Sequence, residues 1–369
     1  MKTIYFIASS VTPEKNAKGG NLVIYRHLKK LENEGYDIKI IQTYKRNKLS
    51  EFKEINISRM RFPLRKNSFS KKCRLALDYQ KVVWKLKKND SIIISILGDY
   101  SSLLSYHISN HANIPFYLIY HDDNLFDEVY SSCSILTSSE TIRIISACKH
   151  IFAVSQPMKD LLLKNGAASV SLLYPMPEGV RNINRNRNLD KNLFHIGTIY
   201  ENIHECIIRK IAKSCEINSY KFNLIANISN SFRTKFENEN NINFINQLSQ
   251  PNSLFDLLID KADLMIVFYS DHYQERRSTY SFPSKFVELS HLTIPIIIIA
   301  PEQSALGKWC IEHNWLTYSK TEDLESINIL IQSLKNDDFW KSCSEQAKLV
   351  SDTIFNPINI HLQLLNALH

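Results

Sequence analysis

Short apolar runs alternate with amphipathic, helix-like stretches along most of this chain, and the alternation occurs twice. The two series are separated by a polar break, Arg181-Asn-Ile-Asn-Arg-Asn-Arg-Asn188, which offers almost nothing to bury. Strands that alternate with helices form parallel sheets covered by their crossover helices. The sequence therefore predicts an α/β protein of two Rossmann-like, doubly wound domains facing a central cleft, with a ligand at the carboxyl ends of the strands.

A length of 369 residues suits two domains of ordinary size. We expect a first domain at 1–177, a linker at 178–191, a second domain at 192–345 and a final segment at 346–369. Strands are predicted at 4–8, 37–43, 91–97, 116–120, 150–154, 193–197, 222–226, 242–245, 264–269 and 294–300. Helices are predicted at 21–33, 69–88, 155–166, 201–213, 252–259, 283–292 and 305–313, and in the tail from 321. Residues 44–68 are expected to be irregular.

The composition is that of a soluble globular protein, with 44% hydrophobic and 22% charged residues. No window approaches the roughly 20 apolar residues that span a bilayer. The first residues, 1–8, have the basic start of a signal peptide, but polar residues soon interrupt them, so a strand is the better interpretation. The seven cysteines are scattered and form no CxxC pair, which favours free thiols in a reducing compartment. We therefore expect a cytoplasmic protein.

The net charge of +8 is unevenly distributed. Residues 1–90 hold 22 Lys and Arg against 8 Asp and Glu, whereas residues 91–369 hold 23 against 29. The helix at 69–88 is especially basic and contains Trp84, an interfacial anchor. This pattern predicts an anionic partner, and we expect peripheral contact with the inner face of the cytoplasmic membrane through residues 44–90. An ordinary solvated surface is the alternative. No nucleic-acid partner is expected, because no recognised binding motif accompanies the charge.

The strongest local signal is the segment Tyr280-Ser-Phe-Pro-Ser-Lys-Phe-Val-Glu288, a loop that leads into a helix before an isoleucine-rich strand. Pro283 suits the first helical turn. The amides near Ser284 and Lys285, together with the lysine ammonium, would form an anion site. Glu288 shares that helical face and can accept two hydrogen bonds from a ribose diol. The alternative is a capped helix in which Glu288 only offsets Lys285.

This segment resembles the donor-binding region of GT-B glycosyltransferases, of the family 4 or group 1 type found in bacterial polysaccharide biosynthesis. That region often reads Pro-Ser-Lys, then a Glu within one turn, then a strand with a proline. Further pieces follow in the expected order, and the resemblance covers most of the chain: Lys18-Gly-Gly20, Ile151–Met158, Phe194–Thr198 and Lys261–Val267. The resemblance implies a nucleotide-sugar site built from Gly19, Gly20, Gly197, Thr198, Pro283, Ser284, Lys285 and Glu288.

The resemblance also assigns roles to the domains. The first would hold the acceptor and the second the nucleotide-sugar, while the final segment at 346–369 would return to the first domain as a helix. The donor is a co-substrate, so no cofactor is expected. No metal is expected either, because GT-B enzymes generally need none and no second cluster accompanies His121, Asp122 and Asp123.

The chain departs from the family pattern in two places. Many retaining members carry a Glu-x7-Glu pair, whose first position here is Tyr280. Many also carry an Arg and a Lys after the opening strand of the second domain, and residues 197–204 contain neither. Lys285 would then take more of the phosphate charge, with help from Arg276 or Arg277. Retention or inversion of the sugar stays open.

His121 and Asp122 follow the predicted strand at 116–120 and are the candidate catalytic residues. A group at the carboxyl end of a strand points into the cleft, where the base of an inverting transfer should lie. In retaining relatives the matching His instead binds the donor sugar, and a plain polar turn is the remaining interpretation. Asp99 and Tyr100 follow another strand and are candidates for acceptor contact.

These features together predict a metal-independent glycosyltransferase. It would move a sugar from a nucleotide-sugar to a surface glycan, such as lipopolysaccharide or capsule, including a lipid-linked one. A nucleotide-sugar epimerase of the same fold and a non-catalytic partner in glycan assembly are the alternatives. A Rossmann dehydrogenase is disfavoured, because no GxGxxG follows an early strand.

Overall fold

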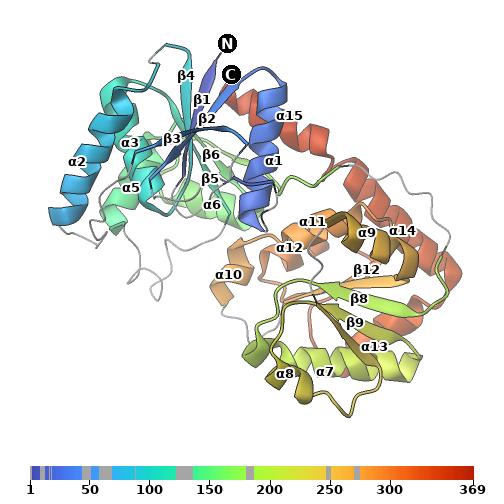
Figure 1. Cartoon of the computed structure of the whole chain (residues 1–369). Helices are drawn as coiled ribbons and strands as arrows, with labels where there is room; N and C mark the ends of the chain where they lie inside the picture. Colours follow the sequence, from blue (N-terminus) through green and yellow to red (C-terminus); the bar gives the residue numbers. More distant parts are fainter. Residues whose placement is uncertain are drawn as a thin grey trace. The chain divides into compact units, whose positions relative to one another are not determined.

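The computed structural model describes residues 2–8, 13–15, 17, 19–43, 51–57, 69–87, 89–121, 136–179, 187–246, 251–269 and 275–369, without the side chains of 56, 251–253 and 275–277. The chain divides into two compact units (Figure 1). Unit 1 comprises Met1–Met176, Tyr280–Phe282 and Ile358–His369, and unit 2 comprises Pro177–Thr279 and Pro283–Pro357. Two short segments from the second half of the chain therefore belong to unit 1.

Within the described residues, unit 1 holds a parallel sheet of seven strands in the order β3-β2-β1-β4-β5-β6-β7. The strands are β1 Thr3–Ala8, β2 Asp37–Gln42, β3 Lys53–Asn56, β4 Ser91–Ile96, β5 Phe116–Tyr120, β6 His150–Ala153 and β7 Val170–Leu172. The central strands are buried on both faces, which is why β4 reads Ser-Ile-Ile-Ile-Ser-Ile. In β1, Ile4 lies opposite Ile38 on one side and Ile92 on the other.

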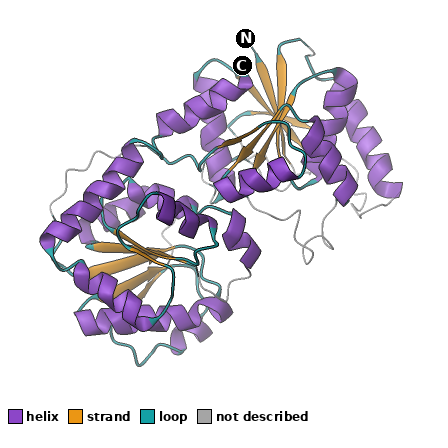
Figure 2. Cartoon of the chain, turned by 180° about the vertical axis from the view of Figure 1, so that it is seen from behind, coloured by secondary structure: helices purple, strands orange, loops and turns teal. Residues whose placement is uncertain are grey.

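Helices cover both faces of this sheet, as Figure 2 shows. They are α1 Gly20–Asn33, α2 Phe69–Val83, α3 Tyr100–Ala112, α5 Ser138–Ala147, α6 Gln156–Lys164 and α15 Pro357–Leu368. The predictions missed α3, α5, β3 and β7. The strand β3 falls in the segment expected to be irregular, where its charged edge sequence Lys-Glu-Ile-Asn hides the apolar signal.

Unit 2 has the same architecture as unit 1. Within the described residues, its parallel sheet has six strands in the order β10-β9-β8-β11-β12-β13. The strands are β8 Asn192–Ile196, β9 Lys221–Ile225, β10 Ile242–Ile245, β11 Leu264–Phe268, β12 Ile296–Ile299 and β13 Tyr318–Ser319. The helices are α7 Glu201–Asn218, α8 Asn230–Thr234, α9 Pro251–Lys261, α10 Glu275–Tyr280, α11 Ser284–Ser290, α12 Ala305–Glu312, α13 Leu324–Ser333 and α14 Asp337–Asp352. The fully buried Ile207, Phe222 and Ile331 belong to its core.

Both sheets reverse their direction of winding beside their first strand. In unit 1 the reversal lies between β1 and β4, and in unit 2 it lies between β8 and β11. Ligands of doubly wound sheets bind beyond the carboxyl ends of the strands at such a point. The predicted pair of doubly wound α/β sheets is confirmed, and each unit has its own candidate binding position.

The end of the predicted linker is tied to unit 2. Arg187 donates from Nε and Nη2 to both carboxylate oxygens of Asp263, at 3.1 and 3.2 Å. The hydroxyl of Tyr220 donates to the same buried carboxylate at 2.6 Å. These bonds compensate the burial of Asp263, which is fully enclosed. Among the described helices, none has the length and apolar content needed to cross a membrane.

Candidate functional site

The loop after β8 lies at the point where the sheet of unit 2 reverses. Gly197 is the first residue of this loop, and its amide donates to the carbonyl of Ile225 at 3.3 Å. Thr198 is exposed, so its hydroxyl is open to a ligand. A Cβ on Gly197 would stand 3.2 Å from Nε2 of His195, closer than most carbon contacts. Glycine is therefore the residue that fits over this imidazole.

His195 is a buried residue of β8 that the sequence reasoning missed. Its Nδ1 lies 3.1 Å from the carbonyl oxygen of Ile266, and because a carbonyl only accepts, Nδ1 carries the proton. Nε2 is then an acceptor, and it has no hydrogen-bond partner among the described residues. The ring stacks on Phe268 at 4.3 Å. Burial lowers the pKa of His195 to about 3, so the ring is neutral at physiological pH.

His204, in the first turns of α7, contacts the same phenylalanine. Its ring meets Phe268 edge-on at 5.3 Å, and its Nδ1 accepts a hydrogen bond from the amide of Tyr200 at 3.3 Å. Burial lowers the pKa of His204 to about 4. The loop after β8 thus lies beside two neutral imidazoles and a buried aromatic ring. An Arg and Lys pair here would have supplied charge, and the chain supplies neutral polar rings instead.

The helix α11 carries the candidate phosphate and ribose residues. Pro283 is its N-cap residue, one position earlier than expected, and a proline offers no side-chain hydrogen bond to the first turn. Ser284, Lys285 and Glu288 are all half-buried. Because the three residues are spaced by one, three and four positions, they share one side of the helix.

One aromatic residue fixes this helix. Phe286 is fully buried and meets the rings of Trp309 and Trp315, each with a centroid distance of 5.1 Å. It also meets Phe355 edge-on at 5.5 Å. Because Phe286 is packed in the core, α11 cannot rotate about its axis. The directions of Lys285 and Glu288 are therefore fixed.

The remaining predicted donor residues, Gly19 and Gly20, belong to unit 1. Gly19 has φ 59° and ψ −138°, a conformation that only glycine adopts readily. Its carbonyl accepts from the amides of Leu22 and Val23, so it closes the first turn of α1. Space is open around both glycines within 4 Å of an added Cβ. Lys18, the other member of this motif, lies outside the described residues.

Of the two candidate catalytic residues, His121 and Asp122, the structure describes only His121. His121 follows β5 directly and is half-buried, whereas Asp122 lies outside the described residues. Burial lowers the pKa of His27, a fully enclosed residue of α1, and the nearby charges of His121 and His361 lower it further. His121 and His361, which are distant in the sequence, therefore both lie close enough to His27 in unit 1 to affect its charge.

The expected acceptor contact of Tyr100 is wrong. Tyr100 is fully buried, and its hydroxyl donates to Asp78 at 3.0 Å. Asp99 is the N-cap residue of α3 and accepts from the amide of Ser101 at 2.8 Å. The two residues follow β4, as expected, but they start a helix that sequence reasoning missed.

Tyr280 occupies the position at which many retaining relatives have a glutamate. It belongs to unit 1, where its carbonyl accepts from Ser155 Oγ at 2.5 Å. Phe282 packs edge-on against Tyr174 in the same unit, at 5.2 Å. The side chains of Arg276 and Arg277, the expected helpers of Lys285, lie outside the described set. Within the described residues, no group of three His, Cys, Asp or Glu side chains is arranged to hold a metal ion.

Together the two sheets and their points of reversal define the GT-B fold of glycosyltransferases, as the sequence predicted. TarM of S. aureus has this fold, with a TM-score of 0.74 at 11% identity, over 100% of this chain and 98% of TarM. HepE of Anabaena, solved with UDP and glucose, gives 0.68 at 12% identity, over 100% and 99%. A glycosyltransferase of Rickettsia africae gives 0.68 at 16% identity, over 99% and 97%. No protein-family model matches this chain, and neither does any curated protein.

Proposed function

We propose that this protein is a glycosyltransferase that takes its sugar from a UDP-sugar bound by unit 2. The observation that carries the proposal is the loop of Gly197 and Thr198 at the reversal point of a sheet whose fold matches TarM and HepE over nearly their full length. HepE was solved with UDP-glucose, and TarM with UDP and α-GlcNAc-glycerol. The same fold and the same kind of position support the same class of donor here.

In this proposal α11 binds the nucleotide. Glu288 accepts two hydrogen bonds from the ribose diol. The Lys285 ammonium and the first-turn amides of α11 hold the diphosphate. The departing nucleoside diphosphate gains negative charge as the glycosidic bond breaks, so a fixed cation at that position stabilises the transition state more than the ground state. No metal is assigned to the site.

We further propose that unit 1 presents the acceptor, with Gly19 and Gly20 leaving room for close approach and His121 at the end of β5. In an inverting transfer His121 or Asp122 would take the proton from the acceptor hydroxyl, and in a retaining transfer His121 would hold the donor sugar. The acceptor is proposed to be a surface glycan, such as lipopolysaccharide or capsule, including a lipid-linked one. The chain would then work at the inner face of the cytoplasmic membrane, which residues 44–90 would contact.

A thermal-shift screen against UDP-, GDP-, CMP- and dTDP-sugars tests the donor class, because a bound donor stabilises the fold. Stabilisation by UDP-sugars in the native chain, and its loss in Lys285→Ala and Glu288→Ala, is the expected result. Unchanged stabilisation in both variants would remove α11 from the site. Incubation with UDP-N-acetylglucosamine alone, followed by product analysis, separates transfer from epimerisation, because only an epimerase converts the donor without an acceptor.

A further inference from the structure

Helix α2 of unit 1 turns three charged residues inward and leaves large apolar residues exposed. Its buried side chains are Lys71, Arg74, Asp78 and Val82. Phe69 is 80% exposed, Leu77 37% and Trp84, just past the helix end, 88%. Spacings of eight and seven residues place these three on one face. A surface helix of a globular protein normally shows the opposite arrangement.

The inward charges fix this orientation. Arg74 donates from Nη2 to the carbonyl of Thr43 at 2.7 Å and from Nε to Asp78 at 3.3 Å. Tyr100 of α3 donates its hydroxyl to Asp78 at 3.0 Å. A rotation of α2 that buried its apolar face would break these bonds and expose the charges. The hydrogen bonds of the buried side therefore fix the apolar residues on the exposed side of α2. Exposed apolar residues of this kind suit a membrane interface.

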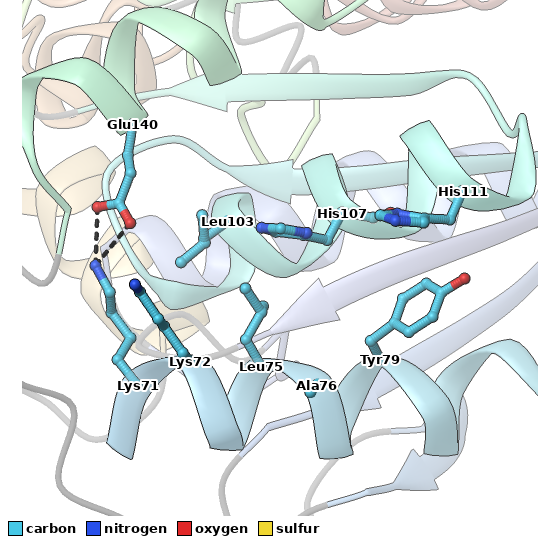
Figure 3. Close-up of a pocket in the computed structure, with 9 residues that line it drawn as sticks. All are labelled: Lys71, Lys72, Leu75, Ala76, Tyr79, Leu103, His107, His111 and Glu140. Carbon is cyan, nitrogen blue, oxygen red and sulfur yellow. Dashed lines mark hydrogen bonds and ion pairs between the residues drawn. The ribbon is translucent and has the colours of Figure 1, made fainter. Parts of the chain in front are cut away.

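A pocket of about 420 Å³ opens beside this face, between α2 and α3, with α5 at one end (Figure 3). Its middle is apolar and is lined by Leu75 and Ala76 of α2 and Leu103 of α3. Figure 3 shows the side chains of α2 directed toward α3 across the gap. The volume lies within the range of small-molecule sites.

Among the described residues, one end of the pocket carries one cation without an ion pair, Lys72. Lys71 donates to both carboxylate oxygens of Glu140 at 2.8 Å, so these two charges cancel. Burial tends to raise the pKa of Glu140, but the bonds from Lys71 and Thr137 lower it below its usual value, so the carboxylate stays ionised. Lys72 is exposed at the same end and has no ion pair among the described residues.

The opposite end is aromatic. Tyr79 lies 5.1 Å from the ring of His111, which stacks with His107 at 6.1 Å. His111 Nδ1 donates to the carbonyl of His107 at 2.8 Å. Burial lowers the pKa of His107, which keeps that ring uncharged near neutral pH. From Lys72 to Tyr79 the pocket runs along seven residues of helix, or about 10 Å.

We propose that this pocket binds a lipid phosphate of the membrane. The hydrocarbon chain lies along Leu75, Ala76 and Leu103 toward the aromatic end, and the phosphate meets Lys72. The exposed apolar face of α2 inserts beside it into the membrane interface. A cation at one end and apolar walls beyond it match an amphipathic anion. The exposed apolar residues of α2 would hold the pocket at the membrane surface, from which the lipid would enter. The inference deepens the proposed membrane contact and rests on that part of the proposed function alone.

The first test uses decyl phosphate below its micelle concentration as the probe, with binding to the full chain measured by isothermal titration calorimetry. Ala76→Phe fills the pocket and should abolish binding. Gln80→Phe adds the same ring one turn away, at an exposed position outside the pocket, and should bind as the native chain does. Inorganic phosphate and octyl glucoside, which lack the chain and the charge respectively, should bind far more weakly than decyl phosphate.

The charge is tested with a matched pair of lysines. Lys72→Gln should weaken decyl phosphate binding about fivefold or more, whereas Lys85→Gln, exposed on the same segment but outside the pocket, should leave it unchanged. Unchanged binding in both Ala76→Phe and Lys72→Gln would overturn the proposal. So would binding of inorganic phosphate with equal affinity.

Vesicle flotation identifies the source of the lipid. Phosphatidylcholine vesicles are doped with phosphatidylglycerol in one arm and with polyprenyl phosphate in the other, at equal charge. A loss of flotation for Ala76→Phe relative to the native chain in one arm identifies the source as bulk phospholipid or as a carrier lipid, and native flotation of this variant in both arms contradicts the proposal. Because Glu288→Gln leaves this pocket intact, lipid binding by that variant is expected to be native, which separates failure here from failure of the donor site.

Discussion

The imidazole of His195 lies against Gly197, so that a Cβ on the glycine would come within 3.2 Å of Nε2. Gly197→Ala should force the ring or the loop to shift by a few tenths of an ångström and destabilise the protein by about 1–3 kcal/mol. We expect weaker UDP-sugar binding as well, because this loop is part of the proposed site. Urea unfolding and donor titration measure the two effects. Native values for both would mean that the loop is not packed on His195.

A pair of neighbouring glycines tests the first turn of α1. Gly19→Ala should destabilise unit 1 by roughly 1–3 kcal/mol, because its positive φ strains any other residue. Gly20→Ala has open space and a helical conformation, so it should be neutral or stabilising by up to about 1 kcal/mol. Urea midpoints of both variants give the comparison. Equal effects would show that the conformation of Gly19 is not the constraint.

Removal of the buried carboxylate of Asp263, which binds the end of the linker, should strongly reduce the free energy of unfolding. Asp263→Ala leaves Arg187 and Tyr220 without their shared acceptor, and we expect a loss of about 3–5 kcal/mol. Tyr220→Phe deletes the bond from the hydroxyl to Asp263 and the bond from Arg187 to the hydroxyl but retains the ion pair, so a loss of about 1–2 kcal/mol is expected. Chemical denaturation of both variants checks the ranking. A loss for Asp263→Ala no larger than for Tyr220→Phe would contradict it.

The buried imidazoles predict a loss of stability in acid. The pKa of His204 is lowered to about 4 in the folded protein, so between about pH 6.5 and pH 4 the unfolded chain binds a proton that the folded chain does not. Stability from this residue is complete above pH 6.5 and falls as the pH drops through that window. His204→Asn, whose amide oxygen can still accept from Tyr200, should reduce the difference in unfolding free energy between pH 7 and pH 5 by on the order of 1 kcal/mol. An unchanged difference would show that His204 titrates normally.

Most of the fold could be predicted from the sequence because strands buried on both faces are written as continuous apolar runs. The runs at β1, β4, β5, β8, β11 and β12 give the alternation and its two series directly. The missed elements carry weaker signals. The helix α3 spans Tyr100–Ala112 and has serines on its buried side, so its periodicity is faint. The edge strand β3 is charged and short.

The candidate site could be predicted only where a local motif marks it. Lys285 and Glu288 stand out by their spacing after a proline, a pattern that a short helix explains. His195 could not be found this way, because a lone histidine inside an apolar strand is usually a buried residue with satisfied partners. Its significance comes from Ile266, a residue of the neighbouring strand that fixes its proton, and from Gly197, because an added Cβ there would crowd the buried Nε2. The role of α2 likewise depends on which face the fold turns inward.

Whether α11 binds the donor is tested most directly by isothermal titration calorimetry of a UDP-sugar into the native chain, Glu288→Gln and Glu312→Gln. Glu312 is exposed at the end of α12 and serves as a control with the same change of charge in the same unit. We expect at least a tenfold loss of affinity for Glu288→Gln, because a charged acceptor of two ribose hydrogen bonds is lost, and no loss for Glu312→Gln. Equal affinity in all three proteins would mean that α11 does not bind the donor.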